Sequence, residues 1–258
     1  MTRLFDRYDA GALVAMFREA GVGEALRLKG FEHLAVTIAD GGALPHVLLR
    51  AEKAGRRHEL LDACLRRVEI APGLLGASLP CERRKPLDLL LVQWVREGDP
   101  TARFEPGRPP LPLQAHPGLG VLRRAFRVAV HIAADLGADG VANRPKFFHD
   151  AVIFYRSRLF LFFDGTEQGR FEALHRDLEG FSLRDATLAV ASWCVRDGGG
   201  QILRWEPGYQ IFPVSPRLTA HFHSPQYADE VAAARETHHF GIEAGVLTEA
   251  RAQWTHLP

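Results

Sequence analysis

The segment that most restricts the fold is a glycine turn followed by a long amphipathic run. The turn is Gly118-Leu119-Gly120, and it comes directly after Pro117. Behind it apolar side chains recur every three or four positions, at Leu122, Ala125, Phe126, Ala129, Ile132, Ala133 and Leu136. This is the 3.6-residue period of a helix with one buried face, and Gly137 is placed to end it. The pattern predicts a helix of about five turns that begins at the glycine turn.

The start of this predicted helix is a candidate anion site. The first backbone N–H groups of a helix have no partner inside it, and the helix dipole favours negative charge in front of them. Because Gly118 and Gly120 carry no side chains, a pyrophosphate could approach the backbone closely, and Arg123 and Arg124 add positive charge. The alternative is that Pro117 and the glycines only turn the chain into a core helix.

The elements around this helix alternate between strands and helices. An apolar run at residues 87–95 predicts a buried strand, and residues 111–114 predict a short one before the turn. A strand at 138–143, a helix at 147–156 and a strand at 158–165 follow. Two helices and a strand are expected over 169–195, then a hairpin turn at 197–201 and a helical tail over 229–254.

The order of strand, glycine turn, long helix, strand, short helix and strand resembles the core of the GNAT family of N-acetyltransferases. In that family a Q/R-x-x-G-x-G/A loop binds the pyrophosphate of acyl-CoA through backbone N–H groups. Over residues 110–164 the resemblance implies that acetyl-CoA or another acyl-CoA is the cofactor and that a small-molecule or protein amine accepts the acyl group. The cofactor-binding residues that it implies are Gln114, Gly118, Leu119, Gly120, Val121, Arg123, Arg124 and Asn143.

The same resemblance implies catalytic residues after the glycine turn. A later helix of the family often supplies a tyrosine acid, and Tyr155 stands in the corresponding helix. His116, beside the turn, and His149, at the start of that helix, are candidate bases that could face one cleft. Two features depart from the family. Gln114 lies one position too far from Gly118, and the chain between the predicted linker and the turn is too short for the family's preceding strands.

The first seventy residues predict a separate helical bundle. Apolar residues at helical spacing occur in three segments, and glycines at 21, 41, 42 and 55 are placed to end helices. Together with the Leu-Phe opening and the segment "RAEKAGRRHELLDACL", this resembles the effector-associated, death-fold-like domains of bacterial conflict and signalling proteins. The resemblance implies partners with the same helical fold. We therefore expect an α+β protein with a helical domain at 1–72, a linker at 73–86 and a GNAT-like domain at 87–258.

Composition excludes several classes of protein. The chain has 32 basic and 31 acidic residues, so no overall charge attracts nucleic acid or an acidic membrane. Its longest apolar runs are far shorter than the ~20 residues of a spanning helix. The three cysteines are widely spaced and odd in number, which favours a reducing, cytoplasmic compartment. No metal is expected, because His221 and His223 lack an obvious third ligand.

Two further interpretations stay open. The chain could be a non-enzymatic interaction or sensor protein that acts through its helical domain. It could also be a cysteine–histidine hydrolase with Cys194 as nucleophile and His149 as base, although neither residue has a local protease signature.

Overall fold

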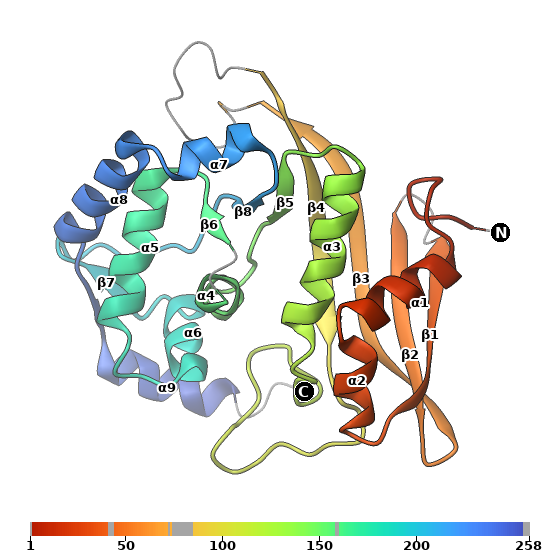
Figure 1. The fold of residues 1–258 in the computed structure, drawn as a ribbon. Coiled ribbons are helices and arrows are strands. Elements are labelled where there is room, and N and C mark those ends of the chain that lie inside the picture. The colour runs from red at the N-terminus through yellow and green to blue at the C-terminus, as the bar shows by residue number, and fades with distance from the viewer. Residues whose placement is uncertain (1, 41–43, 72, 74–84, 158–159, 255–258) are drawn as a thin grey trace. The chain divides into compact units, whose positions relative to one another are not determined.

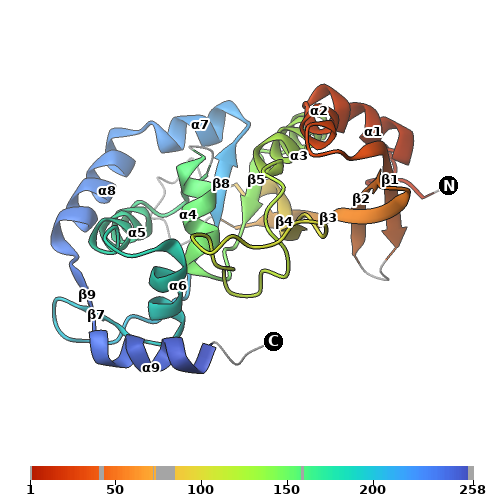
Figure 2. The same cartoon turned by 90° about the horizontal axis from the view of Figure 1, so that it is seen from below.

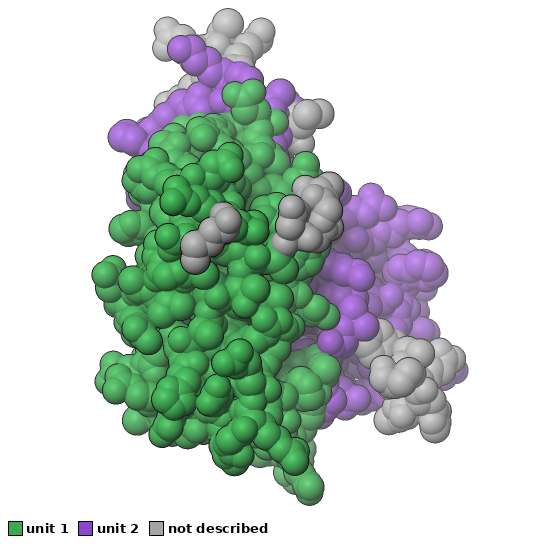
Figure 3. All heavy atoms as spheres, turned by 90° about the vertical axis from the view of Figure 1, so that its right-hand side faces the viewer, with its two compact units in different colours: residues 1–69, 87–108, 114–143 green, residues 70–86, 109–113, 144–258 purple. Residues whose placement is uncertain are grey.

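The computed structural model describes residues 2–40, 44–71, 73, 85–157 and 160–254. The chain is a mixed α+β protein (Figure 1) that forms two compact units. Unit 1 comprises residues 1–69, 87–108 and 114–143, and unit 2 comprises residues 70–86, 109–113 and 144–258 (Figure 3). The predicted α+β class is therefore observed, whereas the units do not follow the predicted boundaries at residues 72 and 86.

Unit 1 is built on a mixed sheet in which the strands follow their sequence order, β1-β2-β3-β4-β5. The pairs β1–β2 and β2–β3 are antiparallel, and β4 runs parallel to β5. The strands are β1 (Glu32–Asp40), β2 (Pro45–Lys53), β3 (Arg56–Ile70), β4 (Leu87–Glu97) and β5 (Gly140–Asn143). A parallel pair needs a crossover, and the predicted amphipathic helix supplies it as α3 (Leu122–Asp135). The prediction of this helix and of β5 is confirmed.

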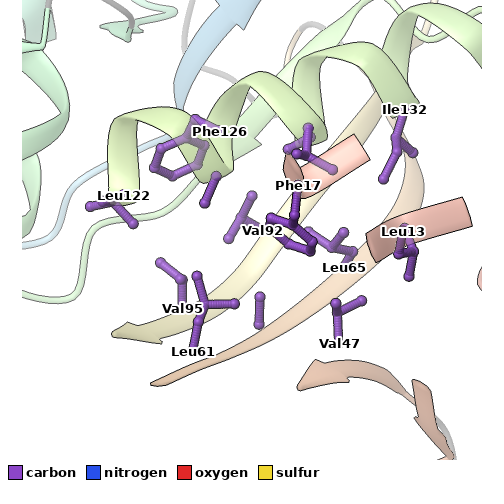
Figure 4. A pocket seen from close by; sticks show the side chains of 14 residues that line it. Leu13, Phe17, Val47, Leu61, Leu65, Val92, Val95, Leu122, Phe126 and Ile132 are labelled. Atoms are coloured by element: carbon purple, nitrogen blue, oxygen red, sulfur yellow. The ribbon is translucent and has the colours of Figure 1, made fainter. Parts of the chain in front are cut away.

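Three helices of unit 1 lie on one side of this sheet (Figure 2): α1 (Ala10–Glu19), α2 (Val22–Arg27) and α3. Leu13 and Phe17 of α1 and Phe126 of α3 point toward strand residues such as Val92 (Figure 4). An apolar cavity of about 40 Å³ remains between these side chains. The core of unit 1 therefore lies between the helices and one face of the sheet.

The predicted helical bundle at residues 1–72 is wrong beyond residue 31. Among the described residues of this segment only α1 and α2 are α-helices, and β1, β2 and β3 follow them within residues 32–70. The error has a physical cause in β3, where Leu60, Leu61, Cys64 and Leu65 are all buried. A strand buried on both faces has no clean two-residue alternation and cannot be told from a helix by periodicity. Gly55, taken as a helix end, belongs to the tight turn between β2 and β3 and has a positive φ of 72°.

The predicted linker at 73–86 lies mostly outside the described residues. Since β3 and β4 on either side of it are neighbours in one sheet, the linker does not separate a helical domain from an α/β domain. Partners with a death-fold-like domain were expected from that bundle, and this expectation loses its basis with it.

Unit 2 is mainly helical. Its helices are α4 (Phe148–Arg156), α5 (Gly165–Asp177), α6 (Leu183–Ala191), α7 (Pro216–Phe222), α8 (Pro225–Thr237) and α9 (Ala244–Trp254). Two short antiparallel pairs accompany them: β6 (Leu161–Phe162) with β8 (Gln210–Pro213), and β7 (Val195–Asp197) with β9 (Phe240–Ile242). The predicted helix at 147–156, the helices and strand within 169–195 and the turn at 197–201, where Arg196 bridges Ile202, are thus confirmed. Of the strand predicted at 158–165, Leu161–Phe162 form β6, and residues 158–159 lie outside the described residues. The strand predicted at 111–114 is wrong, because these residues form no regular element.

Candidate functional site

The glycine turn precedes α3 as predicted, although a loop and not the expected strand leads into it. Helix α3 begins at Leu122 with Val121 as its N-cap residue, and no side chain caps this end by the usual hydrogen bond. Gly120 adopts a positive φ of 70°, a conformation that glycine enters without strain. Gly118 and Gly120 are exposed, while Leu119 and Val121 are buried. The turn therefore leaves its two glycines exposed and anchors itself with its two apolar side chains.

A carboxylate of the chain itself faces this turn. The carboxyl group of Glu97, the last residue of β4, accepts hydrogen bonds from the backbone N–H groups of Gly120, Val121 and Leu119. Burial raises the pKa of Glu97, and these N–H groups and the charge of Lys29 lower it by less, so the pKa stays above the ordinary value. The turn before α3 thus holds a carboxyl oxygen of the chain itself, and its role as a site for a ligand anion stays a prediction.

The position of Glu97 also limits the space in front of the turn. A Cβ atom added at Gly118 would lie 3.3 Å from Oε1 of Glu97. The other carboxylate oxygen, Oε2, is buried and has no hydrogen-bond partner among the described residues. A ligand anion could reach the N–H groups only if the Glu97 side chain moved away.

The strand geometry explains why Glu97 points toward α3. Val95 lines the apolar cavity beneath α3 (Figure 4), and residues two apart in a strand share a face, so Glu97 lies on the same side. Val92 lines this cavity as well. Since residues 92 and 95 would face opposite sides in a regular strand, the alternation of β4 breaks between them, as in a β-bulge.

The other predicted cofactor residues of unit 1 differ in their surroundings. Arg123 and Arg124 are exposed on the first turn of α3. The Arg124 side chain lies against α2, with Nε 3.4 Å from the position of a Cβ at Gly21. Gln114 is half-buried. Nothing in these surroundings tests whether Arg123, Arg124 and Gln114 bind a cofactor, so that role stays a prediction.

Asn143, the last residue of β5, is the most unusual polar group of unit 1. It is only 4% exposed, and neither its Oδ1 nor its Nδ2 has a hydrogen-bond partner among the described residues. It pairs in register with Val92, whereas β4 continues to Glu97. A buried amide without partners costs free energy of about 1–3 kcal/mol, so a group of a ligand or a water is its expected partner.

Tyr155 and His149, the predicted catalytic residues of unit 2, both lie on α4. The Tyr155 hydroxyl donates a hydrogen bond to Glu172 over 3.1 Å, and burial together with Glu172 raises its pKa to about 12. His149 is buried, and burial lowers its pKa against the effect of Asp150, whose Oδ1 lies 3.2 Å from Nε2. Its Nδ1 is buried without a partner in the described part of the chain.

These contacts bear differently on the predicted roles. Tyr155 packs against Phe171 and His175 of α5. Its hydroxyl is already engaged in a hydrogen bond to Glu172 within unit 2. Burial lowers the pKa of His149, and its Nδ1 has no partner in the described part of the chain, which suits a base. His116 is exposed and belongs to unit 1, so the cleft that it would share with His149 stays a prediction.

Cys194 does not have the surroundings of a nucleophile. It is fully buried in the core of unit 2, and burial and Glu243 raise the pKa of its thiol. A catalytic cysteine instead needs a lowered pKa and access to substrate. His221 lies on α7 and His223 is the C-cap residue of the same helix.

The described residues contain no group of three or more His, Cys, Asp or Glu side chains that could hold a metal ion. Within the same residues, no helix has the length and apolarity to cross a membrane.

Glu97 is the residue that sequence reasoning missed. The signal was present, because an acidic residue that ends a buried apolar strand and precedes Gly98-Asp99 is out of place as a core residue. Its partner turn lies about twenty positions later, however, and only the sheet and α3 bring the two together.

Comparisons with known proteins add little to this geometry. No model of a protein family matches the chain, and no curated protein matches it. Among solved structures, the chain is similar to one titled "AtaT complexed with acetyl-methionyl-tRNAfMet", with 12% identity and a TM-score of 0.33 over 82% of this chain and 88% of that one. At this TM-score the likeness does not establish a common fold.

Proposed function

We propose that unit 1 carries an acyl-CoA-binding turn of the kind found in N-acyltransferases. The observation that supports this most directly is the turn itself, where three successive backbone N–H groups just before α3 hold a carboxyl oxygen of Glu97. Backbone N–H groups in front of a helix can accept a phosphate oxygen in the same way.

Two further features support the same proposal. The family resemblance implied several strands before the turn, and β1–β4 stand there, so the shortage of chain that the sequence indicated does not exist. Asn143 then offers a buried amide with unused hydrogen-bonding capacity at the end of β5. Acceptance of the acyl group by an amine, with Tyr155 as the acid, is the finer part of the proposal and rests on the resemblance alone.

Glu97 has a definite role in this proposal. Its carboxylate occupies the place of a phosphate group and must leave before acyl-CoA binds. Because burial raises the pKa of Glu97, loss of its negative charge costs less here than in water. The free protein therefore keeps its anion site closed with a side chain of its own.

The second candidate function is a non-enzymatic interaction or sensor protein, and one observation favours it. If Glu97 never leaves, the glycines serve only as a turn, and its carboxyl group holds that turn through the backbone N–H groups of residues 119–121. The first function requires the Glu97 side chain to move away from the turn, and the second requires it to stay. Substitutions at Glu97 therefore distinguish the two.

The test is calorimetric titration of the full chain with acetyl-CoA and with free CoA. The variants are Glu97→Gln, Gly120→Asp and Gly120→Ala. Gly120→Ala is the matched control, because alanine introduces the same backbone strain at positive φ without the charge. If the turn binds CoA, Glu97→Gln should bind at least about tenfold more tightly than the wild type, and Gly120→Asp should not bind.

Two outcomes would decide against an acyl-CoA site at the glycine turn. Absence of binding by both the wild type and Glu97→Gln would leave the interaction protein as the remaining candidate. Equal binding by Gly120→Asp and Gly120→Ala would place CoA elsewhere. For the finer proposal, Tyr155→Phe should bind CoA like the wild type and lower acyl transfer to an amine. Unchanged turnover would remove Tyr155 from the reaction.

A further inference from the structure

A second group of polar side chains lies on unit 1, away from the glycine turn. It consists of His46 from β2, Asp62 from β3, and Trp94 and Arg96 from β4. Its side of the sheet follows from alternation, because the sequence neighbours Val47, Leu61 and Val95 point into the apolar cavity beneath the helices (Figure 4). The cluster therefore lies on the sheet face opposite α1 and α3.

A buried carboxylate stands at the centre of this cluster. The Asp62 side chain is 7% exposed, with Oδ1 3.2 Å from Nδ1 of His46 and Oδ2 2.6 Å from Nη2 of Arg96. A buried carboxylate is stable only when it is paired and hydrogen-bonded. Here both oxygens have a partner, so the requirements of Asp62 are met within the cluster.

The partners of Asp62 are not satisfied in the same way. A carboxylate at Nδ1 holds the proton on that nitrogen, which leaves Nε2 of His46 as a hydrogen-bond acceptor. Nε2 has no hydrogen bond within the described residues, and neither do Nε and Nη1 of Arg96. The Arg96 side chain is 77% exposed and that of His46 is 24% exposed. The cluster thus offers an oriented acceptor and free cationic donors to solvent.

The ring of Trp94 packs beside His46 in this cluster. It meets the ring of His46 edge to face, with centroids 4.7 Å apart. The two rings belong to β2 and β4, and the strand between them carries Cys64 directly opposite His46. Cys64 is fully buried, and burial raises the pKa of its thiol, so it is not available as a nucleophile. The His46 imidazole is therefore held by two contacts, the ring of Trp94 and the carboxylate of Asp62.

We propose that His46, Asp62, Trp94 and Arg96 form a binding site for a small oxyanion that also carries a hydrogen-bond donor. Hydrogen phosphate and α-hydroxy acids both have this chemistry. The anionic oxygen accepts from Arg96, whose guanidinium suits carboxylate and phosphate, and the hydroxyl group donates to Nε2 of His46. Asp62 is a positioning residue that orients both. This site is independent of the acyl-CoA proposal, because it uses neither the glycine turn nor Glu97.

The test follows the His46 imidazole signals by NMR while inorganic phosphate, lactate or acetate is added to the full chain. Phosphate should shift these signals with a dissociation constant on the order of 1 mM, a weak affinity that suits so few contacts. Acetate has no hydroxyl group and should bind more weakly than lactate. A response to lactate as well as phosphate identifies the site with hydroxy acids in general, and a response to phosphate alone restricts it to phosphates.

Variants separate this site from other anion sites. Arg96→Gln and His46→Gln should each weaken phosphate binding at least about tenfold, the former followed by the His46 signals and the latter by the Trp94 indole signal. Arg50→Gln is the matched control, since Arg50 is also an arginine of this sheet in an ion pair, with Glu59. Asp62→Asn should weaken binding, and a second imidazole tautomer should appear in the nitrogen shifts of His46. If phosphate and lactate leave the His46 signals unchanged, or if Arg96→Gln binds like Arg50→Gln, the proposal is wrong. Gly120→Asp should have no effect on these signals.

Discussion

The contact between α5 and α8 in unit 2 allows a quantitative test of the packing. A Cβ atom added at Gly169 of α5 would lie 2.8 Å from Cβ of Ala234 and 2.9 Å from the backbone N of Arg235, and closer still to the carbonyl oxygen of Val231. Real Cβ contacts essentially never fall below 3.0 Å. Since the obstacle is largely helix backbone, Gly169→Ala must push α8 away from α5.

The expected loss of stability combines two opposing effects. Alanine is favoured over glycine inside a helix by about 1 kcal/mol. Overpacking a well-packed core costs about 1–3 kcal/mol, and a collision with backbone belongs at or above the upper end. We expect a net loss of about 2 kcal/mol. For a chain of this size, each kcal/mol lowers Tm by about 2–4 °C, so Tm should fall by roughly 4–8 °C.

The assay is thermal unfolding followed by circular dichroism, with Gly245→Ala as the matched control. Gly245 is also helical, in α9, but a Cβ there would meet no atom within 4 Å. This variant should be stabilised by up to about 1 kcal/mol, because only helix propensity changes. If Gly169→Ala is as stable as Gly245→Ala, the α5–α8 packing described here is refuted.

Two further predictions concern titratable groups. Because the pKa of Glu97 is raised, the folded state binds the proton of its carboxyl group more tightly than the unfolded chain does. The stability gained from this protonation is present below the ordinary glutamate pKa and is lost as pH rises through the raised value. Glu97→Gln, neutral at every pH, should therefore gain stability relative to the wild type as pH rises through that window in urea denaturation, and parallel curves would contradict this. Cys194 is buried with a raised thiol pKa, so an alkylating reagent at neutral pH should modify it only after unfolding, as peptide mass spectrometry can determine. Rapid labelling of the native protein would restore the hydrolase interpretation.

Local sequence determined the elements whose signal lies within one segment. Helix α3 was predictable because its apolar stripe repeats at the helical period between two glycine boundaries. The same holds for α4, α5 and α6 and for the glycine-rich turn after β7. In each case the side chains that define the element are neighbours in sequence, so no knowledge of distant contacts was needed.

Tertiary structure alone decided the N-terminal sheet and the state of the candidate site. The β3 strand is buried on both faces, and its apolar pattern depends on which helices and strands cover it, which the local sequence does not record. That a glycine turn precedes α3 could be predicted from the sequence, and its role as an anion site stays a prediction. That Glu97 faces this turn depends on the long-range packing of β4 and α3, and such pairings leave no periodic trace in the chain.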